Sequence, residues 1–351
     1  MPIDVLIVGQ GLAGSLLAWQ LLREGLSILV IDDGAQNASQ VAAGLVNPIT
    51  GQRLVKSAHV DELLPLAMAC YRELAEVFKQ TFFVSLPMWR SLSDANLRRA
   101  AERRLVDANY EFYLEGITEA VKGLNSTHGV LRQRHTGFLR TEALLDCLRH
   151  HLMTLQCYRC VMLDYADIRL NPVLCWQDIQ PRHLVFCEGH RARVNPWFGT
   201  LPFQVAKGEI LECRTSAYCP EAIINYGDWW LPQGEQHFKL GATFDVNDAH
   251  PHPTLEAQKR LLMGLARAMP DLSPIDVVEQ RAGIRPTTLD KQPFIGTHPC
   301  YANLHVFNGF GAKGSLAIPG YARYFAAWLK QQIPLPAHCD VRRYYETCFA
   351  A

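Results

Sequence analysis

The first 33 residues constrain the fold most, because they have the pattern of a complete βαβ unit. The apolar run Val5–Val8 leads into a glycine-rich turn at Gly9–Gly14, with the sequence GQGLAG. A helical stretch follows as far as Arg23, and a second apolar run, Ile28–Ile31, ends at Asp32. Strand, glycine turn, helix, strand and acid in this order predict the dinucleotide-binding unit of a doubly wound, Rossmann-like domain.

Each residue type in this unit has a physical role. Gly9 permits the tight turn, Gly11 lets a pyrophosphate approach the backbone, and Gly14 lets the helix pack closely on the strand. The free amide groups at the start of the helix attract a diphosphate. The carboxylate of Asp32 can accept hydrogen bonds from an adenosine ribose. The residues expected to bind the dinucleotide here are Gly9, Gly11, Leu12, Ala13, Gly14, Asp32 and Asp33.

The composition indicates a cytoplasmic protein without strong affinity for polyanions. The chain has 351 residues, with 34 Lys+Arg and 34 Asp+Glu, so no overall charge attracts nucleic acid or an anionic membrane. No apolar run approaches the ~20 residues that span a bilayer. The chain enters its first strand without a basic leader, and its 11 cysteines lie in apolar surroundings, which predicts reduced thiols. Cys157 and Cys160 have no second cysteine pair near them, so no metal site is expected.

The remaining sequence alternates between helical and strand-like patterns and has no internal repeat. Apolar residues at helical spacing predict helices at 61–79, 141–152 and 254–269. Residues 93–122 are expected to form a helix followed by a loop. Residues 183–187 and several segments within 200–245 are strand-like, and a strand, a glycine turn and a helix return at 304–328. This order predicts two interleaved domains of α/β class, α+β overall.

Two further segments indicate a long cofactor held at both ends. Small residues in the segment 37–48 leave space for a flat, bulky group, and Ser39 and Gln40 can bind phosphate or ribityl oxygens. Near the C-terminus another strand leads into a glycine-rich turn, Gly309–Ser315, and then into a helix. Two junctions of strand, glycine-rich turn and helix in one chain indicate a long cofactor that is bound at both of its ends.

Taken together, these segments resemble the D-amino-acid oxidase superfamily of FAD-dependent oxidoreductases, which includes glycine oxidase and sarcosine oxidase. VAAGLVNP at 41–48 is similar to the flavin-proximal loop of that family. The segments CEGHRAR, LPFQVAKGEI and GIRPTTLDKQPFIG stand where the family has its further motifs, so the resemblance covers essentially the whole chain in order. GLVNPITGQRLVKS and GFGAKGSLAIP are most similar to the flavin domain that modifies wobble uridine in transfer RNA.

The resemblance implies a doubly wound FAD-binding domain interleaved with a mixed-sheet substrate domain. The FAD-binding domain is expected at 1–80, 136–199 and 281–351, and the substrate or cap domain at 81–135 and 200–280. The implied reaction oxidises the C–N bond of a small amine or amino acid by hydride transfer to flavin N5, with oxygen as acceptor. Two alternatives stay open. One is a tRNA-modifying oxidoreductase that removes a carboxymethyl group from a wobble uridine, and the other is a flavoprotein dehydrogenase with a protein or quinone acceptor.

The resemblance also implies roles for individual residues. Arg285 would clamp the substrate carboxylate, Lys313 would stabilise the anionic reduced flavin, and either Trp229 or Trp230 would face the flavin. Further cofactor contacts are expected from Ser39, Gln40, Ala43, Gly44, Leu45, Gly189, Gly309, Gly311, Ala312, Lys313, Gly314 and Ser315. Glu188 departs from the family, which has a small residue there. No cysteine lies in the turn where some relatives attach flavin covalently, so we expect non-covalent FAD.

Overall fold

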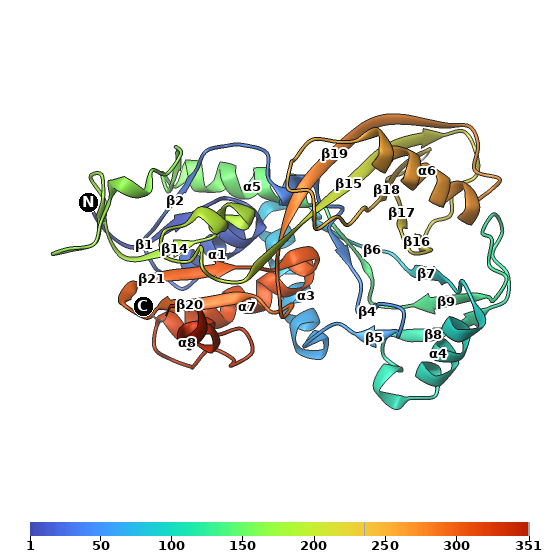
Figure 1. The fold of residues 1–351 in the computed structure, drawn as a ribbon, viewed down its shortest axis with the longest axis horizontal. Coiled ribbons are helices and arrows are strands. Elements are labelled where there is room, and N and C mark those ends of the chain that lie inside the picture. Colours follow the sequence, from blue (N-terminus) through green and yellow to red (C-terminus); the bar gives the residue numbers. More distant parts are fainter. Residues whose placement is uncertain (235, 350–351) are drawn as a thin grey trace.

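The opening βαβ unit lies at the centre of a sheet in one lobe of the molecule (Figure 1). The computed structural model describes residues 1–234 and 236–349. In it, β1 (Pro2–Val8) is followed by α1 (Leu12–Arg23) and β2 (Ile28–Asp32). β1 pairs in parallel with β2 on one side and with β14 on the other. Its last four residues are buried, because apolar clusters cover both faces of the sheet.

The sheet of this first lobe has six strands in the order β11-β2-β1-β14-β21-β20. All neighbours are parallel except the pair formed by β20 and β21. The four further strands are β11 (Tyr158–Cys160), β14 (Gln180–Phe186), β20 (Phe294–His298) and β21 (Tyr301–Asn308). The helices of this lobe are α1, α2 (Ala38–Val41), α3 (Val60–Phe78), α5 (Thr141–Thr154), α7 (Gly314–Leu329) and α8 (Tyr345–Cys348). The doubly wound, Rossmann-like fold class is thus confirmed.

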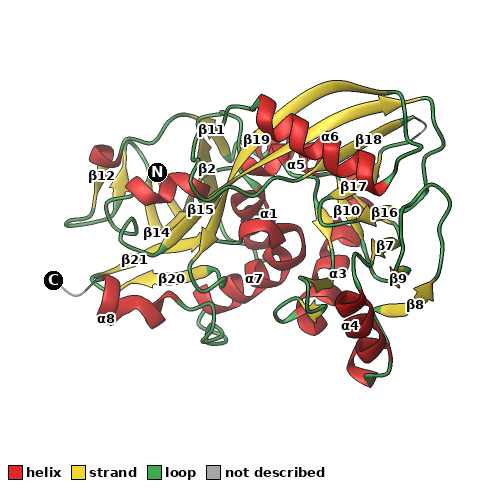
Figure 2. Cartoon of the chain, turned by 45° about the vertical axis from the view of Figure 1, so that its right-hand side comes forward, coloured by secondary structure: helices red, strands yellow, loops and turns green. Residues whose placement is uncertain are grey.

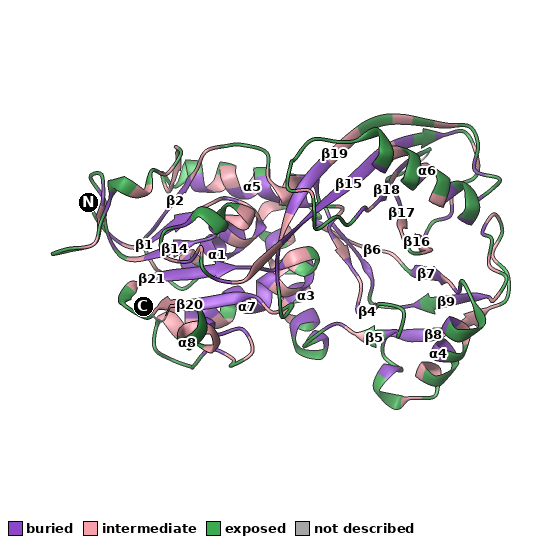
Figure 3. Ribbon diagram, viewed as in Figure 1, coloured by how far each residue is buried: buried purple, intermediate pink, exposed green. Residues whose placement is uncertain are grey.

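The second lobe is built on an eight-stranded sheet in the order β19-β15-β18-β17-β16-β7-β9-β8. Its strands are β7 (Met88–Ser91), β8 (Leu114–Thr118), β9 (Val130–Gln133), β15 (Phe203–Thr215), β16 (Ile223–Asn225), β17 (Trp229–Pro232), β18 (His237–Gly241) and β19 (Ile275–Thr288). Helix α6 (Leu255–Ala268) packs on the outer face of this sheet, where Trp230 and Ile224 belong to its core cluster. The inner face carries Trp229 and Leu231. Figure 3 shows the exposed side of α6 turned to solvent.

Two long strands connect the lobes. β15 and β19 pair antiparallel along almost their whole lengths and run from the eight-stranded sheet to the first lobe (Figure 2). Position 281, the expected start of the last FAD-binding segment, lies within β19. A small sheet of β3 (Leu45–Val46), β10 (Gly137–Leu139) and β6 (Phe83–Ser85) also joins segments assigned to different domains. The division into domains at these boundaries stays a prediction.

The sequence was misleading for one segment. Within 93–122, α4 (Ala95–Leu105) is the expected helix, but residues 114–118 form edge strand β8 where a loop was expected. A bulge between Leu114 and Gly116 interrupts the alternation of side chains, so the strand pattern is hidden in the sequence. The remaining strands are β4 (Ile49–Thr50), β5 (Val55–Lys56), β12 (Ile168–Arg169) and β13 (Cys175–Trp176). No helix in the described part of the chain is long and apolar enough to cross a membrane.

Candidate active site

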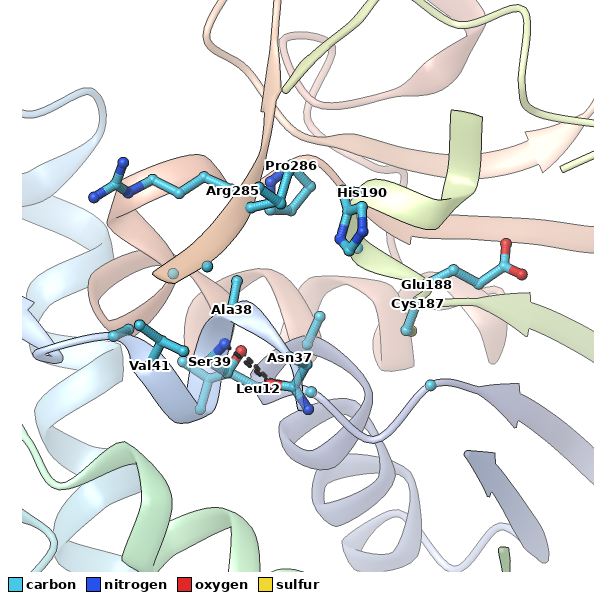
Figure 4. Close-up of a pocket in the computed structure, with 18 of the residues that line it drawn as sticks. Leu12, Asn37, Ala38, Ser39, Val41, Cys187, Glu188, His190, Arg285 and Pro286 are labelled. Atoms are coloured by element: carbon cyan, nitrogen blue, oxygen red, sulfur yellow. Dashed lines mark hydrogen bonds between the residues drawn. The ribbon is translucent and has the colours of Figure 1, made fainter. Parts of the chain in front are cut away.

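A cavity of about 630 Å³ lies where the two lobes meet. It extends from the carboxyl ends of β1 and β2, the usual place for a ligand in a doubly wound sheet, to Trp229 on β17. Figure 4 shows Asn37, Ala38 and Ser39 on one side of it and Arg285, Pro286 and His190 on the other. Segments far apart in the sequence therefore form its walls.

The three glycines of the turn after β1 have two different roles: two allow the chain to pack closely on itself, and one lines the cavity. Gly9 has φ +102°, and a Cβ atom there would lie 2.6 Å from the carbonyl oxygen of Cys187. A Cβ atom on Gly14 would lie 1.8 Å from the carbonyl oxygen of Gly9. A Cβ atom on Gly11 would instead make only ordinary contacts, 3.5 Å from Ser39 Oγ and 3.9 Å from Asn37 Cγ, and Gly11 lines the cavity. Gly9 and Gly14 are thus required by the chain itself, and Gly11 keeps the cavity open for a phosphate.

A hydroxyl group occupies the N-terminus of α1 where a diphosphate oxygen would bind. The backbone amide of Leu12 donates to Ser39 Oγ at 3.0 Å, and no acidic residue lies in the first turn of α1. The side chain of Gln40 has a different task, because its Oε1 accepts from the Asn37 amide at 2.9 Å in a capping box of α2. Gln40 does not line the cavity.

The two acids after β2 are held by the chain at the nucleotide end. Asp32 accepts hydrogen bonds from the amides of Gln10 (2.7 Å) and Gly34 (2.8 Å), which fixes its carboxylate at the cavity wall. Asp33 forms an ion pair with Arg191, which comes from the turn after β14. Partial burial raises the pKa of Asp33, but the hydrogen bond from Arg191, the hydrogen bond from the Ala35 backbone amide and the charge of Arg191 together outweigh it and leave the pKa below its usual value.

Glu188, the residue that departs from the family, lies at the same end of the cavity. Its Oε1 accepts from the Tyr165 hydroxyl at 2.6 Å and its Oε2 from the Asn195 amide at 2.8 Å. Burial raises the pKa of Glu188, and these two hydrogen bonds oppose that effect. The Glu188 carboxyl group therefore fixes Tyr165, which lines the cavity and which no sequence pattern had indicated.

Trp229 and Arg285 lie at the other end of the cavity. Trp229 lines it, whereas Trp230 is fully buried in the core under α6. Arg285 Nη1 donates to the carbonyl oxygens of Thr243 (3.1 Å) and Lys207 (3.3 Å). Its Nε and Nη2 donate to no acceptor in the described part of the chain, and Arg285 lines the cavity. The guanidinium thus has an unused edge with which a carboxylate can pair.

The backbone around Arg285 shapes its position. The guanidinium lies against Gly208, where a Cβ atom would be 2.0 Å from Nη2, and 5.7 Å from the ring centroid of Phe244. The two carbonyl groups that hold it come from Lys207 on β15 and from Thr243 in the segment after β18. Lys207 is buried, and its Nζ donates to Asp248 at 2.7 Å and lies 3.3 Å from Glu209. Glu209 in turn accepts from the amide of Thr254 at 2.8 Å. A buried, fully paired network therefore supports the arginine.

The second glycine turn closes the cavity from the C-terminal side. Asn308 donates through Nδ2 to the carbonyl oxygen of Gly189 at 2.9 Å, which joins β21 to the turn after β14. Gly309 has φ +86° and packs against Thr288, so it shapes the turn without lining the cavity. The side chain of Lys313 is exposed, and Lys313 is not among the residues that line the cavity.

Most of the residues expected to bind the cofactor or substrate line this one cavity. The expected residues that line the cavity are Gly9, Gly11, Leu12, Ala13, Asp32, Asp33, Ser39, Ala43, Gly44, Leu45, Trp229, Gly189, Arg285, Gly311, Ala312, Gly314 and Ser315. Those outside its lining are Gly14, Gln40, Gly309 and Lys313. Lining residues that the sequence did not single out include Thr141, Tyr165, Gly208, Ala242 and Asn308. Gly208 lies within a recognised motif, so only its role was missed.

The family model for FAD dependent oxidoreductases of the DAO type matches residues 4–328. The chain belongs to the DAO family. FAD is therefore its cofactor, which agrees with the glycine turn, the N-terminus of α1 at the cavity wall and the long cavity between the two lobes. The resemblance on which the sequence analysis relied is confirmed.

Relatives of this DAO-family protein include a glycine oxidase of Pseudomonas aeruginosa, 23% identical over 94% of this chain and 96% of that protein. The tRNA 5-methylaminomethyl-2-thiouridine biosynthesis bifunctional protein MnmC of Legionella pneumophila is 21% identical over 94% of this chain, which spans only 54% of that protein. Among solved structures, a glycine oxidase of Geobacillus kaustophilus has a TM-score of 0.82 at 20% identity, covering 95% of this chain and 96% of its own. An iminodiacetate oxidase of Chelativorans sp. BNC1 has a TM-score of 0.79 at 19% identity, covering 95% of this chain and 98% of its own. These structures share the fold.

Proposed function

We propose that this protein oxidises the C–N bond of a small amino acid or amine and uses oxygen as the electron acceptor. The observation that carries this proposal is that Arg285 lines the same cavity as Trp229 and has an edge of its guanidinium, Nε and Nη2, without a hydrogen-bond acceptor among the described residues. A guanidinium binds a carboxylate through paired, charge-assisted hydrogen bonds and so fixes the orientation of the α-carbon. The similarity to glycine oxidases supports the same assignment.

The residues of the chain would divide the work between them. Bound FAD would supply the two-electron oxidation by accepting a hydride from the carbon next to the nitrogen. Arg285 would hold the carboxylate, and Trp229 would form the apolar wall that keeps water from the reacting carbon. The exposed Lys313 lies between cavity-lining Ala312 and Gly314, and its positive charge would stabilise negative charge at that end of the cofactor.

An anaerobic screen of the FAD-loaded protein tests the proposal. Glycine, sarcosine, iminodiacetate and a set of D- and L-amino acids are mixed with the protein, and loss of the oxidised flavin absorbance is followed. At least one of them should reduce the flavin, and Arg285→Met should lower the second-order reduction rate about 100-fold, because it removes a charged hydrogen-bonded partner. If none of these compounds reduces the flavin, the proposal is wrong.

Reoxidation by oxygen distinguishes an oxidase from a dehydrogenase. Stopped-flow mixing of the reduced protein with oxygen should show rapid return of the oxidised flavin, and Lys313→Met should slow it. Slow reoxidation of the unaltered protein would instead indicate an electron-accepting partner. We also propose that FAD is bound non-covalently, so acid precipitation should leave the flavin in the supernatant. The 11 free cysteines support a reducing, cytoplasmic location.

A second candidate function has one specific observation in its favour. MnmC proteins from Legionella, Marinobacter and Psychrobacter match 91–94% of this chain, which spans about half of their length. On this alternative, the substrate would be a carboxymethylaminomethyl uridine in transfer RNA. Flavin reduction by the isolated modified nucleoside, together with retention of RNA at low salt, would favour it over a free amino acid.

A further inference from the structure

The inner face of the eight-stranded sheet carries a row of polar side chains beside Trp229. Asn225 pairs with Trp229 between β16 and β17, and it pairs with Arg90 between β16 and β7. Residues that pair across neighbouring strands project to the same face of a sheet. Because strands lie about 4.8 Å apart, the Cα atom of Arg90 is about 10 Å from that of Trp229.

Arg90 is buried without a partner of opposite charge. It is 6% exposed, and it forms no hydrogen bond or ion pair with any residue in 1–234 or 236–349. Desolvation alone accounts for its lowered pKa. Buried charges in proteins are normally paired and hydrogen-bonded, because an isolated one costs several kcal/mol.

A second orphaned polar group lies next to it. On β9, Leu131 is the partner of Arg90 and Gln133 is the partner of Met88, so Gln133 is the diagonal neighbour of Arg90 on this face. Gln133 is 1% exposed, and neither of its side-chain amide atoms has a hydrogen-bond partner among the residues described. Buried polar groups that are left unsatisfied are uncommon in folded proteins.

Another buried cation among the residues that the structure describes, Lys207, is paired, which makes the contrast informative. Lys207 is equally well buried and is held by Asp248 and Glu209. Around Arg90, the residues that share its face and strand register are Met88, Leu131, Ile223, Asn225 and Gln133, and none of these is acidic. The anion that would balance Arg90 is therefore absent from its own face of the sheet.

Arg90, Asn225 and Gln133 lie on the same face as Trp229 but outside the lining of the cavity of about 630 Å³. We propose that they form a second anion-binding subsite beside the cavity, which holds a carboxylate or phosphate group of a substrate long enough to extend past Trp229, at the end remote from its amine. This inference rests on the proposed function, since Arg285 is taken to bind the carboxylate at the reacting end. The substrate class is then an amine or amino acid with a second, distal anionic group. Guanidinium and amide N–H groups are the donors that such an oxyanion requires.

Binding of inert carboxylates to the FAD-loaded protein tests the subsite directly. Dicarboxylates from succinate to suberate are compared with monocarboxylates of the same chain length, and their dissociation constants are measured from the change in flavin absorbance. One dicarboxylate length should bind at least tenfold more tightly than its matched monocarboxylate. In Arg90→Met, the ratio of these two constants should fall to about 1.

A matched control lies on the neighbouring strand. Arg132 on β9 pairs with Trp89, so it is on the opposite face, where it lies 3.2 Å from Glu115 and is 49% exposed. Arg132→Met makes the same change of charge and volume and should leave the ratio of dissociation constants unchanged. If it lowers the ratio as much as Arg90→Met does, overall charge explains the effect and the subsite is refuted.

Thermal unfolding separates a binding role from a structural one. Because an unpaired buried guanidinium costs free energy, Arg90→Met should keep or raise the unfolding temperature of the ligand-free protein. A large decrease would show that Arg90 is needed for folding and would contradict the subsite. A phosphorylated amine such as O-phosphoserine, compared with serine in the reduction assay, shows which oxyanion is preferred.

The two proposals can fail separately. If amino acids reduce the flavin but no dicarboxylate has an advantage in the unaltered protein, the subsite is wrong and the proposed function stands. If a dicarboxylate binds through Arg90 but no amine or amino acid reduces the flavin, the reaction class is wrong and the anion site stands.

Discussion

The two ends of the cavity recognise their ligands with different parts of the chain. At the nucleotide end, the wall is largely backbone: the turn Gly9–Gly14, the amide of Leu12, and Asp32 held by two amide hydrogen bonds. At the substrate end, side chains on separate strands do this work, with Arg285 and Trp229 as the main examples. A site that binds its ligand through the backbone can be identified from a short stretch of sequence. A site that binds through side chains on separate strands depends on which strands become neighbours in the fold.

The largest expected effect concerns the two kinds of glycine at the nucleotide end. Gly14→Ala should abolish folding, because its Cβ atom would lie 1.8 Å from a backbone oxygen that cannot move away. Gly11→Ala should leave the fold intact, because its Cβ atom would make only ordinary contacts with Ser39 and Asn37 at 3.5 Å or more, and it should weaken FAD binding, because Gly11 lines the cavity. Soluble yield, circular dichroism and bound flavin distinguish the two. If Gly11→Ala and Gly14→Ala lose folded protein to the same extent, the two glycines do not differ in role as described above.

The next effect tests the substrate end. Gly208→Ala should displace the guanidinium of Arg285, since the new Cβ atom would lie 2.0 Å from Nη2. A displacement of about 1 Å can cost on the order of 100-fold in rate, so kcat/KM for an amino acid should fall by about that factor with FAD content unchanged. Gly264→Ala on α6, where a Cβ atom would lie 3.2 Å from Asp228 Oδ2 and 3.6 Å from Tyr226 Cε2, is the control. An unaltered kcat/KM in Gly208→Ala would show that Arg285 does not bind the substrate.

A smaller effect is expected on the pH dependence of stability, and it comes from His305 in the core of the first lobe. His305 is 2% exposed and contacts His183 (3.0 Å) and Thr297 (3.0 Å), and burial lowers its pKa from 6.5 to about 3. Between these values the unfolded chain binds a proton that the folded chain does not. Stability is therefore lost as pH falls from 6.5 towards 3 and is unaffected above 6.5.

From pH 6.5 to pH 5, this histidine should account for a loss of about 2 kcal/mol in the free energy of unfolding. In His305→Gln, urea unfolding at the two pH values should show a correspondingly smaller decrease. An equal decrease in both proteins would mean that His305 is not the group responsible.

The smallest effect is expected at the mouth of the nucleotide end. Arg191 and Asp33 form an ion pair whose arginine side chain is 49% exposed, and exposed pairs contribute about 0–1 kcal/mol. Arg191→Ala should therefore weaken FAD binding by no more than about fivefold, and added salt should reduce the difference further. A much larger loss would assign to this side chain a recognition role that the backbone is expected to perform.

The same contrast explains how far sequence alone reaches. The first 33 residues determine strand, turn and helix locally, and Arg285 lies in a motif, so both were predicted. The neighbours of Arg285 were not predicted, because Gly208 reaches it only through the pairing of β15 with β19. Side chains alternate along β17, so Trp229 and Trp230 lie on opposite faces of the sheet, but the sequence does not say which face α6 covers. Lys313 lies in the predicted turn, but it is not among the residues that line the cavity.

Because β1 lies between β2 and β14, the sheet of the first lobe can form only late during synthesis of the chain. Val5 on β1 can pair with His183 on β14 only after more than half of the chain has been synthesised. The residues that line the cavity extend as far along the chain as Ile318. Pairings of such long sequence separation form slowly, and the apolar strands stay exposed in the meantime. The cofactor can then bind only to an almost complete chain. Its binding energy adds to the stability of the finished fold, and none of it is available to help the early strands find their partners.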